Sequence, residues 1–194
     1  LLFMPAQVGG MEIILNTPNK LTVLRMVLVP FFMAFLMQDS AWCRTAALAI
    51  FVIASITDAI DGHLARSRNQ ITTFGKFMDP IADKMLTTAA FVVLLSLGRM
   101  SPWALMIILV REFIVSGIRL LAAAKGTVIA ASMSGKIKTV SQMVAIIAAT
   151  ALLNPFFEAG AAKIITEVLI WISTAATALS GAEYVIKNIN LLKE

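Results

Sequence analysis

Four aspartates in one short stretch of this otherwise apolar chain limit how it can fold. The stretch covers residues 58–84, DAIDGHLARSRNQITTFGKFMDPIADK, and lies between two strongly apolar segments. On helices, Asp58 and Asp61 share a face at i and i+3. Asp79 and Asp83 share a face at i and i+4 on the next segment, beyond a short basic loop. We therefore expect two acidic helix faces that confront each other across a gap.

Such a cluster of carboxylates needs compensation. Each carboxylate costs roughly 2.5–3.5 kcal/mol in a bilayer, so four cost on the order of 10 kcal/mol. Basic residues nearby neutralise part of the charge: Arg66, Arg68, Lys76 and Lys84. Side-chain cations do not require the two pairs to approach each other, whereas a divalent cation bound by both pairs does. Oxygen ligands suit Mg²⁺, Mn²⁺ or Ca²⁺, whereas Zn²⁺ prefers the histidine and cysteine that the stretch lacks apart from His63.

The composition indicates an integral membrane protein. Hydrophobic residues make up 59% of the 194 residues and charged residues 14%, with a mean hydropathy of +0.89. The net charge of +5 would suggest nucleic acid in a soluble chain. Here the basic residues cluster in loops beside apolar spans, so we expect them to set topology and bind phosphate, with no nucleic-acid partner. A single cysteine, Cys43, excludes an intramolecular disulfide.

Apolar runs predict an all-α fold, a bundle of six transmembrane helices. The expected spans are 21–37, 42–60, 80–97, 102–124, 139–153 and 164–184. Thr17 and Pro18 signal a helix start, and Pro80 either starts or kinks the third helix. Residues 1–10 look like a leader or a cloning remnant, with Met11 as the natural start and residues 11–194 as a single membrane domain.

The basic residues also predict the orientation. With six spans, one side of the membrane receives Lys20, Arg25, Arg66, Arg68, Lys76, Lys84, Arg119, Lys125, Lys136, Lys138, Lys187 and Lys193. The other side receives only Arg44, Arg99 and Lys163. Because cytoplasmic loops are enriched in lysine and arginine, both termini and the aspartates are expected in the cytoplasm. The expected location is the cell membrane.

The aspartate stretch resembles a known family signature. The pattern is D-x2-D-G-x2-A-R-x8-G-x3-D-x3-D, carried by Asp58, Asp61, Gly62, Ala65, Arg66, Gly75, Asp79 and Asp83. It resembles the CDP-alcohol phosphatidyltransferase signature at every fixed position. The resemblance implies transfer of a phosphatidyl group from CDP-diacylglycerol to an alcohol, with CMP leaving, by a homodimeric membrane enzyme.

The resemblance also implies roles for single residues. Two Mg²⁺ or Mn²⁺ ions are implied, on Asp58, Asp61 and Asp79, with Asp83 near the second ion and acting as the general base. The implied CDP-binding residues are Asp58, Gly62, Ala65, Arg66, Gly75, Asn19 and Thr22. Gly75 has an alternative role in close helix packing. Asn19 and Thr22 are equally explained by a helix start and interface anchoring.

A second group of residues indicates the acceptor. The segments PNKLTVLR, REFIVSGIR and SGKIKT look like the phosphatidylglycerolphosphate synthase branch, whose acceptor is glycerol 3-phosphate. Its phosphate would contact Arg111, Arg119, Lys136 and Lys138. The two arginines lie about 12 Å apart along an ideal helix, so they reach one phosphate only if their side chains converge. Alternatively, Arg111 pairs with an aspartate and Arg119 anchors at the interface. Glu112 is not expected to share a face with Arg111.

The sequence was also compared with three other kinds of function: the same transfer to another acceptor, cation transport and a scaffold without activity. The shared motif also fits inositol phosphate, phosphatidylglycerol or serine as the acceptor. A divalent-cation transporter would need carboxylates along a path through the membrane, whereas these four lie near one face. A membrane scaffold without activity has no use for them.

Overall fold

The computed structural model describes residues 17–67, 73–127, 129 and 132–189. The side chains of residues 17–20, 58–67, 73–77, 79–80 and 83 are outside the description. The described chain is all-α, with six helices: α1 (Thr17–Met37), α2 (Ala41–Ser67), α3 (Thr73–Ser96), α4 (Pro102–Ala124), α5 (Met133–Leu152) and α6 (Ala159–Lys187).

The helices follow the predicted order but extend beyond several predicted bounds. α2 runs through the first aspartate pair to Ser67, and α3 already begins at Thr73, so Pro80 lies inside it. α5 begins at Met133 because the Ser132 hydroxyl caps it, accepting a hydrogen bond from the Gly135 amide at 3.1 Å. Lys136 and Lys138 consequently belong to a helix rather than to the segment ahead of it.

Apolar length supports a membrane protein without fixing its number of spans. Among the described residues, one helix, Ala159–Lys187, is long and apolar enough to cross a bilayer. Shorter apolar helical stretches are Leu21–Met37, Ala41–Thr57 and Lys84–Ser96. The polar aspartate stretch shortens the apolar parts of α2 and α3. Six membrane spans therefore remain a prediction.

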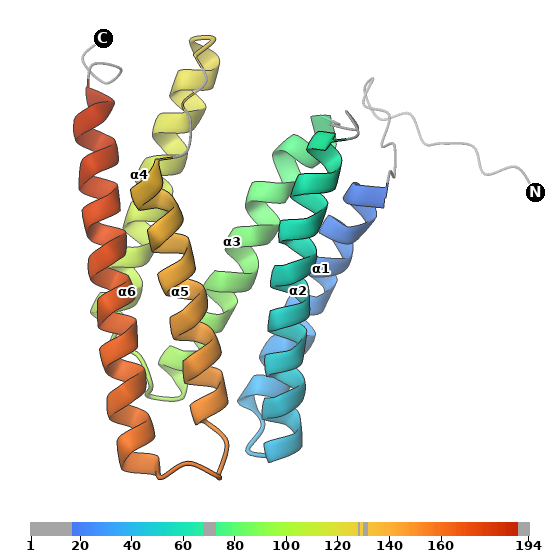
Figure 1. Cartoon of the computed structure of the whole chain (residues 1–194), viewed down its shortest axis with the longest axis vertical. Helices are drawn as coiled ribbons and strands as arrows, with labels where there is room; N and C mark the ends of the chain where they lie inside the picture. The colour runs from blue at the N-terminus through green and yellow to red at the C-terminus, as the bar shows by residue number, and fades with distance from the viewer. Residues whose placement is uncertain (1–16, 68–72, 128, 130–131, 190–194) are drawn as a thin grey trace, which may run out of the picture.

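The helices pack as two groups joined by α5 (Figure 1). In one group α1 contacts both α2 and α3, and in the other α6 contacts both α4 and α5. α5 also contacts α2 and α3, and α3 contacts α4. The end of α2 and the start of α3 lie at the same end of the bundle as the end of α4 (Figure 1). This topology places the aspartate stretch, the C-terminal end of α4 and the N-terminal part of α5, which carries Lys136 and Lys138, at the same end of the bundle.

Two kinds of interface hold the bundle together. Phe32 of α1 and Phe51 of α2 are fully buried, with ring centroids 5.7 Å apart. The face of α6 toward its neighbours instead carries buried Ser and Thr. The hydroxyls of Ser173, Thr174 and Thr177 donate to carbonyls of their own helix, Thr177 to Ser173 at 2.7 Å. Gln142 of α5 donates to the Thr177 hydroxyl at 3.0 Å. Small side chains of this kind let membrane helices approach closely.

Glycine ends α4 in a left-handed conformation, which yields a stability prediction. Gly126 has φ +72°, and the amides of Gly126 and Thr127 donate to the carbonyls of Ala123 and Ala122. A side chain is strained in this backbone region, so Gly126→Ala should lower the free energy of unfolding by about 1 kcal/mol. Thermal unfolding in detergent checks this. Gly117→Ala is the control, since a Cβ at that helical position meets nothing within 4 Å; an equal loss in both variants contradicts the explanation.

Candidate active site

The aspartate stretch covers the C-terminal part of α2 and the first half of α3, two helices that both pack on α1. Asp58 and Asp61 lie toward the C-terminal end of α2, and Asp79 and Asp83 lie in the first half of α3. Both segments are helical, as the predicted spacing requires. The side chains of the predicted metal and CDP site lie outside the described residues: Asn19, Asp58, Asp61, Gly62, Ala65, Arg66, Gly75, Asp79 and Asp83. Their roles stay predictions.

Helix α1 contributes two buried polar residues at this end of the bundle. Thr22 and Arg25 are 3% and 4% exposed, and they lie on the helix that contacts both α2 and α3. Arg25 belongs to the basic residues that the sequence assigns to the cytoplasmic side. Its burial places it in the protein interior. A buried guanidinium is costly without a negative charge nearby, and α2 and α3 both carry carboxylates. Arg25 therefore lies on the helix where it can offset part of their charge.

A compact ionic cluster lies between α4 and α5. Glu112 Oε1 is 2.9 Å from Arg111 Nη1 and 2.5 Å from Lys138 Nζ. Arg111 and Glu112 are adjacent in sequence and were not expected to share a helix face, yet their side chains are in contact. Their Cβ atoms diverge on the helix, but both side chains are long enough to bend toward each other. The described partner of Arg111 is thus a glutamate rather than the aspartate of the alternative interpretation.

The ionic cluster is connected to the aspartate helix. Lys84, next to Asp83 in α3, donates a hydrogen bond to the Ser116 hydroxyl of α4. Ser116 in turn donates to the Glu112 carbonyl at 2.6 Å. The residue after the proposed general base is therefore tied to the turn of α4 that carries Arg111 and Glu112.

The other predicted acceptor residues have different environments. Arg111 Nη2 donates to the Ser180 hydroxyl of α6 at 2.9 Å, and the Arg119 guanidinium carbon lies 5.7 Å from the centre of the Tyr184 ring. Lys136 is exposed, and no contact in the described part of the chain joins it to the cluster. The structure therefore brings Arg111 of α4 and Lys138 of α5 together. Arg119 lies farther along α4, against Tyr184 of α6.

The charges of this cluster favour an anion. The Arg111 and Lys138 side chains are only 10% and 8% exposed, and both contact the carboxylate of Glu112. Lys84 adds a further cation through Ser116. Guanidinium and ammonium groups bind phosphate through charge-assisted hydrogen bonds, and arginine forms such bonds in pairs.

The donor chemistry of the aspartate stretch fits a hard divalent cation. Among the side chains that the structure describes, which do not include these four aspartates, no group of three or more His, Cys, Asp or Glu could hold a metal ion. Four carboxylates on two helices that pack on the same partner are the ligand type that Mg²⁺ and Mn²⁺ prefer.

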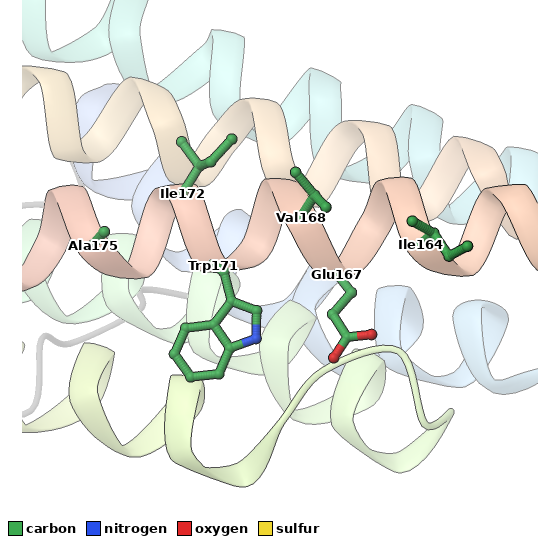
Figure 2. A pocket seen from close by; sticks show the side chains of 6 residues that line it. All are labelled: Ile164, Glu167, Val168, Trp171, Ile172 and Ala175. Atoms are coloured by element: carbon green, nitrogen blue, oxygen red, sulfur yellow. The ribbon is translucent and has the colours of Figure 1, made fainter.

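Two surface hollows lie along α6 on the described part of the molecule. One, of about 490 Å³, lies along α6, and its lining includes Glu167, Trp171 and Ala175 (Figure 2). Its described lining residues include none of the predicted site residues. Another, of about 630 Å³, lies between α4 and α6 and is almost wholly apolar, but Arg111 and Gly181 line it.

Sequence reasoning missed the residues that organise the acceptor side. Ser116 lies one helical turn after Glu112, so a search for polar partners along α4 could have found it. Ser180, Gly181 and Tyr184 come from the last helix, far along the chain, and no local pattern links them to α4. Only the packing of α6 on α4 reveals that contact.

Comparisons with known proteins agree with this arrangement. Residues 15–179 match the CDP-alcohol phosphatidyltransferase family. The CDP-diacylglycerol--glycerol-3-phosphate 3-phosphatidyltransferase of Bacillus subtilis is 40% identical over 190 residues, covering 92% of this chain and 97% of the relative. The enzyme of that name from Rickettsia felis is 37% identical over 177 residues, covering 90% and 96%. A Mycobacterium tuberculosis relative named "Probable phosphatidylglycerophosphate synthase" is 39% identical over 183 residues, covering 92% and 84%. With the helical order, the aspartate spacing and this match over most of its length, the chain belongs to the CDP-alcohol phosphatidyltransferase family and is a transferase.

Proposed function

We propose that this protein transfers the phosphatidyl group of CDP-diacylglycerol to glycerol 3-phosphate, giving phosphatidylglycerol phosphate and CMP. The observation that carries the choice of acceptor is the convergence of Arg111 and Lys138, from two helices, on Glu112. A phosphorylated acceptor suits this cluster, because the Arg111 guanidinium and the Lys138 ammonium can both donate charge-assisted hydrogen bonds to a phosphate. The names of the relatives support the same reaction.

In the proposed mechanism Asp83 takes the proton from the free primary hydroxyl of glycerol 3-phosphate. The hydroxyl oxygen attacks the phosphorus that carries the diacylglycerol. The bond from that phosphorus to the oxygen bridging toward CMP breaks, and CMP leaves with the electron pair. Arg111 and Lys138, with Arg119 and Lys136 farther out, hold the acceptor's phosphate so that its hydroxyl is turned toward α3.

The aspartates have a second role in this proposal. Asp58, Asp61, Asp79 and Asp83 would hold two Mg²⁺ or Mn²⁺ ions, which would neutralise the charge on the diphosphate. The nucleotide lies along α2, where Gly62 and Ala65 leave room beside the helix and Arg66 donates to the diphosphate. Asn19, Thr22 and Gly75 complete the CDP site.

The proposal includes an orientation and an assembly. Six membrane spans with both termini and the aspartates on the cytoplasmic side of the cell membrane agree with the unequal distribution of basic residues. The gathering of the aspartate stretch and the end of α4 at one end of the bundle supports a single active face (Figure 1). We also propose that the protein is a homodimer, and this rests only on its membership of the family.

Release of CMP tests the reaction. Purified protein in detergent receives CDP-diacylglycerol and Mg²⁺ or Mn²⁺ with glycerol 3-phosphate, inositol phosphate, serine or phosphatidylglycerol in separate reactions. We expect metal-dependent CMP release with glycerol 3-phosphate alone. Release with a different acceptor contradicts the acceptor assignment, and absence of release with all four contradicts the proposed reaction.

A further inference from the structure

The side chain of Arg111 lies directly on the backbone of α6. A Cβ added at Gly181 would come within 2.6 Å of Arg111 Cγ and 3.5 Å of Arg111 Cβ. The first distance is far below a normal carbon contact, and the neighbouring atoms belong to the stem of Arg111 rather than to its mobile end. Any side chain at Gly181 would therefore push Arg111 away from α6.

Both terminal nitrogens of Arg111 are also held. Nη1 donates to Glu112 on its own helix at 2.9 Å, and Nη2 donates to the Ser180 hydroxyl at 2.9 Å. Ser180 is 1% exposed, so water does not compete for its hydroxyl. A guanidinium has five N–H donors, and these two bonds leave Nε and one hydrogen on each terminal nitrogen. Nε has no hydrogen-bond partner among the described residues. The group is fixed in direction and retains donors for a ligand.

The same face of α6 contacts the second arginine of α4. Tyr184 lies about one turn beyond Ser180 and Gly181, so these residues share a face. Its ring is 3% exposed and lies beneath the Arg119 guanidinium at 5.7 Å. Ser180, Gly181 and Tyr184 together form what we call the arginine-seating face of α6.

We propose that the arginine-seating face positions Arg111 and Arg119 for the phosphate of the acceptor, and so helps determine acceptor affinity. The inference rests on the proposed function, because it takes these arginines as ligands of that phosphate. Its physical basis is preorganisation: a guanidinium already held in the binding direction loses less conformational entropy when the phosphate arrives. The three residues act through the arginines and are positioning residues.

Gly181→Ala, with Gly117→Ala as its control, tests this inference. Both variants replace a glycine by alanine inside or beside the α4–α6 pair, but a Cβ at Gly117 meets nothing within 4 Å. We expect Gly181→Ala to raise KM for glycerol 3-phosphate by about tenfold or more, as loss of a hydrogen bond to a charged group does. KM for CDP-diacylglycerol should change less than about twofold, since the two arginines are proposed to contact the acceptor and not the nucleotide lipid. A loss of folded enzyme would instead lower the apparent kcat without raising either KM. Gly117→Ala should leave both KM values unchanged.

A double-mutant cycle distinguishes positioning from packing. If Gly181 acts through Arg111, Gly181→Ala should add nothing to KM for glycerol 3-phosphate in an Arg111→Ala background. Ser180→Ala serves as the second variant, because it removes the hydroxyl without adding volume and should also raise that KM selectively. Equal effects of Gly181→Ala on both substrates, or additive effects with Arg111→Ala, overturn the inference.

Tyr184 gives a further check with a conservative replacement. The phenol oxygen of Tyr184 has no hydrogen-bond partner in the described structure, so Tyr184→Phe keeps everything that contacts Arg119. We expect Phe to preserve KM for glycerol 3-phosphate and Leu to raise it, while equal values for both contradict a role of the ring. If the wild-type protein releases CMP only with another phosphorylated acceptor, the proposed function fails. The same comparisons with that acceptor then still decide the positioning inference.

Discussion

Asp83→Asn is expected to abolish turnover while the protein still folds and binds CDP-diacylglycerol. Asparagine has almost the same shape but cannot accept the proton of the acceptor hydroxyl. Loss of a general base lowers kcat by about 10²- to 10⁴-fold. The measurement is the initial rate of CMP release with saturating substrates, together with binding of the nucleotide lipid by calorimetry in detergent.

Asp39→Asn is the matched control for this experiment. Asp39 pairs with Arg44 at 2.7 Å between α1 and α2, at the opposite end of these helices from the aspartate stretch, and its side chain is 94% exposed. An exposed ion pair contributes little, so this variant should keep normal rates. Near-normal rates in Asp83→Asn itself would make the general-base assignment wrong.

Lys138→Met is expected to weaken acceptor binding strongly. The Lys138 side chain is 8% exposed and shares the Glu112 carboxylate with Arg111, so its removal takes away a buried cation from the proposed phosphate site. A hydrogen bond to a charged group contributes about 1.5–3 kcal/mol, which corresponds to a rise in KM for glycerol 3-phosphate of about 10- to 100-fold. Steady-state kinetics with glycerol 3-phosphate varied at saturating CDP-diacylglycerol measures this change.

Lys136→Met provides the comparison within the same helix. Lys136 precedes Lys138 by two residues but is exposed, so screening by water makes its contribution to phosphate binding small. Its loss should change KM for glycerol 3-phosphate by less than about threefold. Equal effects of the two substitutions contradict the location of the acceptor phosphate at the Arg111–Glu112–Lys138 cluster.

Much of the helical order could be predicted from the sequence. Apolar runs gave the order and approximate positions of the six described helices, because burial of an apolar face dominates where helices form. Boundaries were less predictable where polar residues continue a helix beyond its apolar part. α2 thus extends through the aspartates to Ser67, and α5 begins at Met133 through a serine cap.

The two halves of the candidate site differ in how far sequence could reveal them. The aspartates lie within 26 positions at helical spacing, so local pattern alone identifies them. The acceptor side depends on tertiary contacts. Arg111 meets Ser180, which is 69 positions away, and the helix–helix packing that joins them leaves no mark in either local sequence. The contact between Arg111 and Glu112 could not be read from helix faces, because faces describe Cβ positions and long ionic side chains reach beyond them.

Transfer with isotopically labelled acceptor tests the central claim most directly. Glycerol 3-phosphate labelled with ¹⁸O in its free primary hydroxyl is incubated with the enzyme, CDP-diacylglycerol and Mg²⁺, and both products are examined by mass spectrometry. Attack by that hydroxyl on the phosphorus predicts a labelled phosphatidylglycerol phosphate and unlabelled CMP, in equal amounts. CMP accompanied by phosphatidic acid, or by a lipid that lacks the label, would contradict transfer to glycerol 3-phosphate.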